Sequence, residues 1–269
     1  PRTCIDVVKP LIENNTRFKV GSDIHLAHCP ERILPGRIYE EITKNDRVIG
    51  GFDEMSSKMA KGVYASFVKG NLYTTDCTTA EFCKLIENAS RDVNIAFANE
   101  LSLIAGDLGV DINEAIGLAN KHPRVNILKP GIGVGGHCIP IDPWFIYDKA
   151  PDKARLIRAA RDINDHMPAV VAEKIKSAVS GKKNPKIVVL GLSYKPDVAD
   201  LRESPALAVV ELLTEDGFDV SAYDPMIPEK SYPSIKEICE GEDYITVLVP
   251  HTAIKEDLAK AKITNVALF

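Results

Sequence analysis

The sequence predicts an α/β protein with more than one domain, and three observations carry this prediction. Residues 186–269 alternate short β-branched runs with helical segments, an order typical of a parallel, doubly wound sheet. Residues 1–75 also mix short apolar runs with helices. Two long helical runs, at residues 78–105 and 153–179, lie between these regions, and we expect them to form a packing core and a subunit interface. The predicted domains are residues 1–75, 76–180 and 181–269.

Composition narrows the class of protein. A chain of 269 residues with 45% hydrophobic and 26% charged residues is long enough for several hydrophobic cores. The net charge of −5 offers nucleic acid no electrostatic attraction, and no apolar run reaches the length of a membrane span. The six cysteines are scattered without C-x-x-C pairs, which indicates reduced thiols and a cytoplasmic protein. His25, His28 and Cys29 lack a second ligand cluster, so no metal is expected.

The first region is predicted to hold one helix and three strands. Ile5, Val8, Leu11 and Ile12 have helical spacing over residues 5–13. Short buried strands are expected at 24–27 and 47–50, and a last strand at 71–75. Residues 30–36, PERILPG, are punctuated by proline and glycine and form a predicted loop.

The long helix predicted at residues 78–105 is amphipathic. Its apolar face consists of residues at i, i+3 and i+4 spacing: Phe82, Leu85, Ile86, Ala89, Val93, Ala96 and Phe97. Lys84, Asn88 and Arg91 lie at i, i+4 and i+7 and form a polar stripe on the opposite side. By itself such a stripe is typical of a solvated face.

The most informative segment is residues 131–145, GIGVGGHCIPIDPWF. It places Cys138 after a run of glycines, where backbone can approach a ligand and a thiol can be exposed and activated. Gly131, Gly133 and Gly136 match the dinucleotide fingerprint G-x-G-x-x-G, but such a turn must open a helix. Pro140 and Pro143 are expected to prevent a helix from starting here. We interpret the segment as a pocket wall that carries a nucleophile.

The remaining elements follow from helix and strand signals. A helix is predicted at 113–120 before His122-Pro123-Arg124, and the helix at 153–179 is expected to kink or restart at Pro168. Ser204 and Pro205 are the N-cap and first residue of a helix that runs to Glu215 and ends at Gly217. The alternation is completed by strands at 186–190, 219–223, 244–249 and 265–269 and helices at 234–239 and 253–261. The first turn, residues 191–196, has one glycine and suits a nucleotide better than a dinucleotide pyrophosphate.

These segments together resemble the UDP-glucose/GDP-mannose 6-dehydrogenase superfamily. The resemblance rests on motifs that span nearly the whole chain in order: residues 30–36, 45–51, 73–76, 122–126, 131–145, 191–196 and 200–205, with Lys84, Asn88 and Arg91. It implies a C-terminal fragment of a Rossmann domain, a central long-helix dimerisation domain and a UDP-binding domain with a doubly wound sheet. It also implies NAD-dependent, two-step oxidation of the C6 hydroxyl of a nucleotide sugar to a carboxylate.

The resemblance implies roles for individual residues. Cys138 would be the nucleophile that holds the sugar as a thiohemiacetal and then as a thioester. Lys84 would stabilise the oxyanion or hold the water, assisted by Asn88 and Asp142, and Glu31 would do acid-base or water-positioning work. The implied substrate-binding residues are Arg32, Ile33, Arg91, His122, Arg124, Gly135, His137, Tyr194, Lys195 and Arg202.

The segment around Cys138 also indicates the sugar. His137 before the cysteine, Ile141 after it, the Asp142-Pro143-Trp144-Phe145 ending and His122-Pro123-Arg124 resemble the branch that oxidises UDP-N-acetyl-D-mannosamine. UDP-N-acetyl-glucosamine or -galactosamine dehydrogenases are the near alternative.

The superfamily's first strand and G-x-G-x-x-G turn, which bind NAD, have no counterpart here. We expect them upstream of Pro1, and expect a nucleotide-gripping arginine segment beyond Phe269. Two other functions stay open. The chain could be a non-catalytic module for dimerisation and UDP-sugar binding, or it could resemble hydroxyacid dehydrogenases of the 6-phosphogluconate type, against which Cys138 argues. The expected partners are the UDP-sugar and a second copy of the chain, as a homodimer or larger homo-oligomer, with neither nucleic acid nor membrane.

Overall fold

The computed structural model describes residues 1–33, 37–228 and 234–269. The chain divides into two compact units, Pro1–Asn88 and Ala89–Phe269, and each unit is described separately. Leu34, Pro35 and Gly36 of the predicted 30–36 loop lie outside the described residues.

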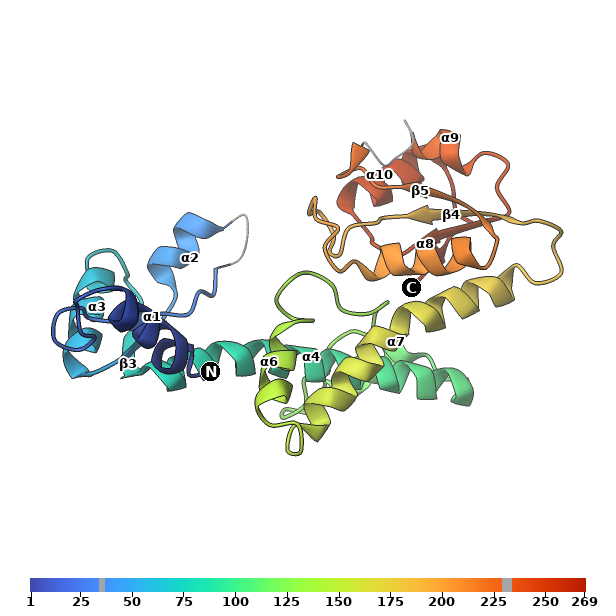
Figure 1. The fold of residues 1–269 in the computed structure, drawn as a ribbon. Coiled ribbons are helices and arrows are strands. Elements are labelled where there is room, and N and C mark those ends of the chain that lie inside the picture. The colour runs from blue at the N-terminus through green and yellow to red at the C-terminus, as the bar shows by residue number, and fades with distance from the viewer. Residues whose placement is uncertain (34–36, 229–233) are drawn as a thin grey trace. The chain divides into compact units, whose positions relative to one another are not determined.

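The first unit contains a small mixed sheet in the order β1-β2-β3 (Figure 1). β2 (Arg47–Gly51) pairs in parallel with β3 (Leu72–Asp76) and antiparallel with β1 (Ala27–His28). The helices are η1 (Cys4–Val8), α1 (Lys9–Asn15), α2 (Ile38–Lys44) and α3 (Glu54–Ala65).

The predicted helix over residues 5–13 is confirmed and opens as the π-helical turn η1. The predicted strands at 47–50 and 71–75 are confirmed. The strand predicted at 24–27 is wrong in position: Ile24 makes only an isolated bridge to Val20, and the paired strand begins at Ala27, opposite Gly51. The strand lies where β2 offers it partners, and the apolar run alone did not predict this.

Helix α4 (Cys77–Leu108) is one continuous helix that runs from the first unit into the second (Figure 1). Its burial differs from the simple amphipathic expectation. Phe82, Ile86 and Phe97 of the apolar face are 42–48% exposed. The polar residues Asn88, Asp92 and Asn99 are at most 8% exposed. Buried polar side chains need hydrogen-bond partners, and for Asp92 and Asn99 these come from helix α7 (Arg155–Ala178).

The structure bears on two proline-based expectations in the second unit, and the first of them is wrong. Helix α6 (Asp142–Lys149) begins directly after the cysteine segment and contains Pro143 in its first turn. Proline is tolerated there because the first helical N–H groups need no intrahelical acceptor. At Pro168 a kink or a restart was expected, and helix α7 continues through this residue without a restart. The helix predicted at 113–120 is confirmed as α5 (Ile112–Ala119).

The C-terminal sheet confirms the predicted architecture. Its four strands are all parallel, in the order β5-β4-β6-β7, and comprise β4 (Lys186–Leu190), β5 (Asp219–Tyr223), β6 (Tyr244–Val247) and β7 (Ala267–Leu268). Helix α8 (Pro205–Glu215) covers one face, and α9 (Ile235–Cys239) and α10 (Thr252–Ala261) cover the other (Figure 1). Ile187 and Val189 accordingly pack with α7 and α8, whereas Val188 and Leu190 pack with α9 and α10. Ser204 caps α8 as predicted, donating to Leu192 O and accepting from Leu207 N.

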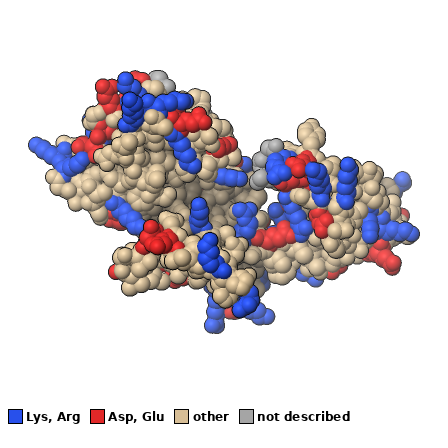
Figure 2. All heavy atoms as spheres, turned by 180° about the vertical axis from the view of Figure 1, so that it is seen from behind, with Lys and Arg blue, Asp and Glu red and all other residues tan. Residues whose placement is uncertain are grey.

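None of the helices in the described ranges combines the length and apolarity that crossing a bilayer requires. Basic and acidic side chains are interspersed over the face of the molecule that Figure 2 shows.

Candidate active site

The glycine segment before Cys138 packs directly against the C-terminal domain. A Cβ atom on Gly135 would lie 2.6 Å from Glu203 O and 2.7 Å from the Cβ of Tyr194. Gly136 has a φ of +86° and donates its N–H to Arg202 O over 3.0 Å. Only glycine fits this approach without moving the backbone. Residues 194 and 202–205, far away in the sequence, therefore form the surface that supports the segment.

Cys138 lies in a turn between that segment and helix α6. Its carbonyl accepts the N–H groups of Ile141 and Asp142 at 3.2 and 2.8 Å, so the turn leads straight into the helix. The thiol is half-buried and His137 is exposed. Residues 120–130, which lead directly into the glycines, contain no strand, so the fingerprint G-x-G-x-x-G does not occupy a Rossmann turn.

Arg202 and Asp200 form a bidentate ion pair beside this turn. Arg202 Nε lies 3.0 Å from Asp200 Oδ1, and its Nη2 lies 2.6 Å from Oδ2. These hydrogen bonds, with that from the Arg202 N–H, lower the pKa of Asp200 to about 2. Arg202 interacts electrostatically with Tyr194 and Cys138, and Asp200 interacts electrostatically with His137. Cys138, His137, Tyr194 and Arg202 thus share one charged neighbourhood within the second unit.

The loop that carries Tyr194 and Lys195 is held by the buried carboxylate of Asp224. Oδ2 of Asp224 accepts the N–H groups of Leu192 and Ser193, the Ser193 hydroxyl, and Nε2 of His251. Burial by itself would raise the pKa of Asp224, but these hydrogen bonds outweigh it and hold the pKa well below its usual range. Tyr194 is half-buried and Lys195 is exposed.

His122 and Arg124 lie on an exposed loop that Asn120 closes. Asn120 donates its amide to Ile127 O and accepts from Ile127 N, at 2.9 and 2.7 Å. The His122 ring accepts the N–H of Arg124 through Nδ1 at 3.3 Å. Both side chains of the predicted pair are exposed to solvent on this loop.

In the first unit the predicted residues Glu31, Arg32 and Ile33 form a connected group. Oε1 of Glu31 accepts the N–H groups of Arg32 and Ile33, and both Glu31 oxygens receive Nη1 of the buried Arg47, at 3.0 and 3.1 Å. Arg32 forms a two-pronged ion pair with Glu87 of helix α4. Glu31 therefore has a structural role in addition to any chemical one.

Helix α4 positions the three residues of the polar stripe. Lys84 is half-buried and Asn88 buried, and both belong to the first unit. Arg91 is exposed and belongs to the second unit with Cys138 and Asp142. The structure therefore divides the predicted catalytic set between two units: Glu31, Lys84 and Asn88 in one, Cys138 and Asp142 in the other.

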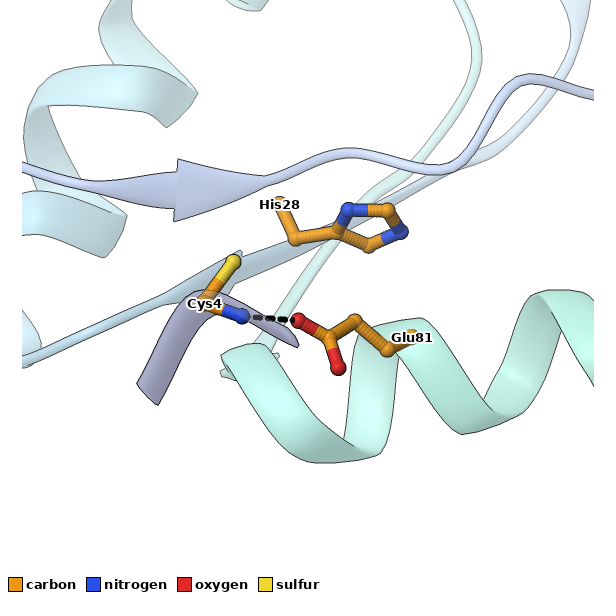
Figure 3. Close-up of side chains that lie close together, drawn as sticks. All are labelled: Cys4, His28 and Glu81. Atoms are coloured by element: carbon orange, nitrogen blue, oxygen red, sulfur yellow. Dashed lines mark hydrogen bonds between the residues drawn. The ribbon is translucent and has the colours of Figure 1, made fainter. Parts of the chain in front are cut away.

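A second cluster contains the buried residues Cys4 and Glu81 with the half-buried His28 (Figure 3). One potential ligand atom from each lies within 4.8 Å of the others. Both Glu81 oxygens accept backbone N–H groups, of Thr3 and Cys4, each at 2.8 Å. Burial, reinforced by Glu81, raises the pKa of Cys4 far above its usual range. A protonated thiol and an engaged carboxylate indicate that Glu81 caps helix η1.

Several residues that organise the site were not predicted from the sequence. They are Arg47, Glu87, Asp92, Asn99, Arg161, Asn164, Asp200, Asp224 and His251. Asp92 and Asn99 had a usable signal: they lie seven residues apart on a helix whose neighbouring positions are apolar. Asp224 and His251 had none, because their contact joins elements separated by 27 residues.

The parallel C-terminal sheet and the glycine-lined cysteine turn packed against it define an α/β protein of the nucleotide-binding type. Three family models match the chain in order: the NAD binding domain over residues 1–68, the central domain over 78–166 and the UDP binding domain over 188–267. The chain belongs to the UDP-glucose/GDP-mannose dehydrogenase family.

Individual relatives agree with this assignment. The chain is 51% identical to a UDP-N-acetyl-D-mannosamine dehydrogenase of Methanocaldococcus jannaschii, over 98% of its own length and 66% of that relative. It is 55% identical to an NDP-N-acetyl-D-galactosaminuronic acid dehydrogenase of Ralstonia nicotianae, over 72% of this chain and 46% of the relative. The chain thus spans less than two thirds of these relatives.

Solved structures give the same result. The UDP-N-acetyl-mannosamine dehydrogenase of Staphylococcus aureus matches with a TM-score of 0.89 at 44% identity, over 99% of this chain and 64% of that one. The corresponding Pyrococcus horikoshii enzyme matches with a TM-score of 0.91 at 42% identity and the same coverage.

Proposed function

We propose that the protein oxidises the C6 hydroxyl of UDP-N-acetyl-D-mannosamine to a carboxylate in two NAD-dependent steps. The observation that carries this proposal is the half-buried Cys138, held in a turn beside Tyr194 and Arg202. The names of the M. jannaschii and S. aureus relatives support the choice of sugar nucleotide. The alternative is another UDP-N-acetylhexosamine, which the R. nicotianae relative favours.

The proposed chemistry uses the thiol as a nucleophile. Loss of a hydride from C6 and of a proton from its hydroxyl oxygen gives an aldehyde. The sulfur of Cys138 adds to the aldehyde carbon and the thiol proton passes to the aldehyde oxygen, forming a thiohemiacetal. Loss of a second hydride and proton leaves a thioester. Water then attacks the carbonyl carbon, and the C–S bond breaks to give the carboxylate and the free thiol. NAD, when bound, accepts the hydride in each oxidation.

The remaining residues of the proposed catalytic set are Lys84, Asn88, Asp142 and Glu31. Lys84 carries the positive charge that stabilises the oxyanion of the tetrahedral intermediates, with Asn88 and Asp142 orienting the attacking water. Glu31 positions water or transfers a proton. The residues proposed to hold the sugar nucleotide are Arg32, Ile33, Arg91, His122, Arg124, Gly135, His137, Tyr194, Lys195 and Arg202.

We assign no residue of this chain to NAD. Neither the described strands of the first unit nor those of the second lead through G-x-G-x-x-G into a helix, the arrangement that a pyrophosphate requires. The match of residues 1–68 to the NAD binding domain supports a role for the first unit in binding NAD. We further propose three domains, at residues 1–75, 76–180 and 181–269, and a cytoplasmic homodimer.

The test is NADH formation by the full-length protein with UDP-N-acetylmannosamine. We expect Cys138→Ala to lower kcat by about a thousandfold or more, and Lys84→Met by about a hundredfold or more. Cys239→Ala, which removes a buried thiol of the sheet domain, is the control and should leave kcat near that of the wild type. Full activity of Cys138→Ala would contradict the mechanism.

A second candidate is a non-catalytic module that binds UDP-sugars and dimerises. The match of residues 188–267 to the UDP binding domain supports the binding part of this alternative. Titration calorimetry separates the two functions, because the module requires affinity for the sugar nucleotide without affinity for NAD, whereas the full-length enzyme binds both.

A further inference from the structure

The N–H of Gly131, which opens the glycine segment, is held by a buried chain of side chains. Gly131 N donates to Oδ1 of Asn99 over 2.8 Å. Nδ2 of Asn99 donates to Oδ1 of Asn164 over 2.9 Å. Asn164 in turn donates to Oδ1 and the carbonyl of Asp92, at 2.8 and 3.0 Å. Asn99, Asn164 and Asp92 are each at most 1% exposed.

Asp92 sets the donor and acceptor of each hydrogen bond between Asn164, Asn99 and Gly131. Asp92 and Arg161 form a buried ion pair at 2.6 Å. The backbone carbonyl of Asp92 can only accept, and the same Asn164 nitrogen reaches both this carbonyl and Asp92 Oδ1. Asn164 must therefore present its amide N–H₂ to Asp92 and its oxygen to Asn99. Asn99 must then present its N–H₂ to Asn164 and its oxygen to Gly131. Asp92 thus determines, through Asn164 and Asn99, that an oxygen faces the N–H of Gly131.

Besides the hydrogen bond from Gly131, the glycine segment is held by contacts of Ile132, Gly133 and Gly136 with the rest of the second unit. Ile132 is 9% exposed and belongs to the core formed with α7 and α8. A Cβ on Gly133 would lie 3.1 Å from Asn164 O, so the backbone lies directly on α7. Gly136 N is bound to Arg202 O. The segment is therefore held at both ends, and Cys138 follows two residues later.

If the buried polar side chains between α4 and α7 served only to stabilise the packing of the two helices, apolar residues would be expected in their place. Two facing helices gain at least as much stability from well-packed apolar pairs as from a buried ionic and amide network. Such a network is favoured where one orientation must be specified. Within the described ranges, the one backbone group outside α4 and α7 that the side chains of Asp92, Asn99, Arg161 and Asn164 are seen to bond is the N–H of Gly131, which opens the cysteine segment.

We propose that Asn99 and Asn164 are positioning residues for Cys138. They hold the glycine segment in the register that presents the thiol to the substrate, while Asp92 and Arg161 orient their amides. This inference rests on the proposed function for its kinetic consequence. Its structural consequence, a fixed glycine segment, is independent of any activity.

The test uses the full-length protein with Asn99→Leu, which keeps the branched shape and the number of heavy atoms of the side chain but removes both hydrogen bonds. We expect kcat per folded molecule to fall at least tenfold while KM changes less than threefold. Hydrogen exchange of a peptide covering residues 129–138 should accelerate at least tenfold, and the rate of Cys138 alkylation should change at least threefold. A role in stability alone would leave kcat per folded molecule unchanged.

Asn94→Leu is the matched control, because Asn94 is exposed on the same helix and its side chain donates to Ser90 O within that helix. It should leave all three measurements unchanged. If Asn99→Leu does not fold, Asn99→Ser takes its place with the same expectations. Unchanged exchange and alkylation in the Asn99 variant would overturn the inference. A wild-type protein without dehydrogenase activity would instead contradict the proposed function, and exchange would still test the segment.

Discussion

Nε2 of His251 lies 3.1 Å from Oδ2 of Asp224, and both side chains are completely buried. Nδ1 of the same ring accepts the N–H of Asp197 over 2.8 Å, so Nε2 carries the hydrogen and donates to the carboxylate. Asp224 follows β5, and Leu192, whose N–H it accepts, follows β4. The pair therefore joins strand ends at the carboxyl edge of the sheet, beside the loop with Tyr194.

Removing the charge of Asp224 should destabilise the C-terminal domain. Asp224→Asn cannot accept from all the donors that converge on this carboxylate, so we expect a loss of about 2–4 kcal/mol. Urea denaturation of the full chain measures it. Asp219→Asn, exposed at the opposite end of β5, is the control and should change stability by less than about 0.5 kcal/mol.

The same pair predicts a pH dependence. The pKa of Asp224 is lower in the folded than in the unfolded protein, so its stabilising contribution is fully present above about pH 4 and is lost as the pH falls through the folded pKa. The stability difference between wild type and Asp224→Asn should therefore shrink as the pH is lowered below 4. A difference that grew on acidification would contradict this account.

The pKa of Asp200 should depend on Arg202. With the ion pair intact it is about 2, because Nε and Nη2 of the guanidinium donate hydrogen bonds to both oxygens of the carboxylate. Arg202→Gln should raise this pKa toward the ordinary value of about 4. A carbon-detected NMR titration of the Asp200 carboxyl measures the shift, and Arg155→Gln, an exposed arginine at the start of α7, should leave it unchanged.

Replacing either of two glycines of the cysteine segment by alanine should affect kcat very differently. Gly135→Ala places a Cβ 2.6 Å from Glu203 O, a backbone atom that cannot move cheaply, and we expect kcat to fall at least tenfold. Gly131→Ala meets nothing within 4 Å and keeps its N–H. It should retain activity within a factor of about two. Equal effects of the two substitutions would show that Gly135 is not a close contact.

Two exposed helical glycines can be replaced to stabilise the protein. A Cβ on Gly62 in α3 or on Gly117 in α5 meets nothing within 4 Å. Alanine at either position should increase stability by about 0.5–1 kcal/mol, because it removes conformational freedom from the unfolded chain. Thermal unfolding of each variant checks this, and a lowered midpoint would mean that the open face is covered by a partner.

Local signals predicted the C-terminal domain almost completely. Ser204, Pro205 and Gly217 mark the ends of α8, and β4 and β5 have the predicted bounds. The predictions failed where the position of an element depends on more than its own apolar or proline pattern. Pro143 was expected to prevent a helix, but it lies in the first turn of α6, which begins at Asp142. The strand expected at 24–27 lies at Ala27–His28 because β2 pairs with it there.

The sequence alone determined the α/β class, the parallel C-terminal order and Cys138 as the residue of chemical interest, since each depends on periodicity or on residue types close together in the chain. Only the tertiary structure brought Tyr194 and Arg202 to the cysteine turn and Asn99 to Gly131. These contacts join residues 32 to 66 positions apart, between Gly131 and Asn99 and between Gly136 and Arg202. Hydrogen bonds and close packing act through space, and no spacing of residue types along a chain specifies which distant backbone they will meet.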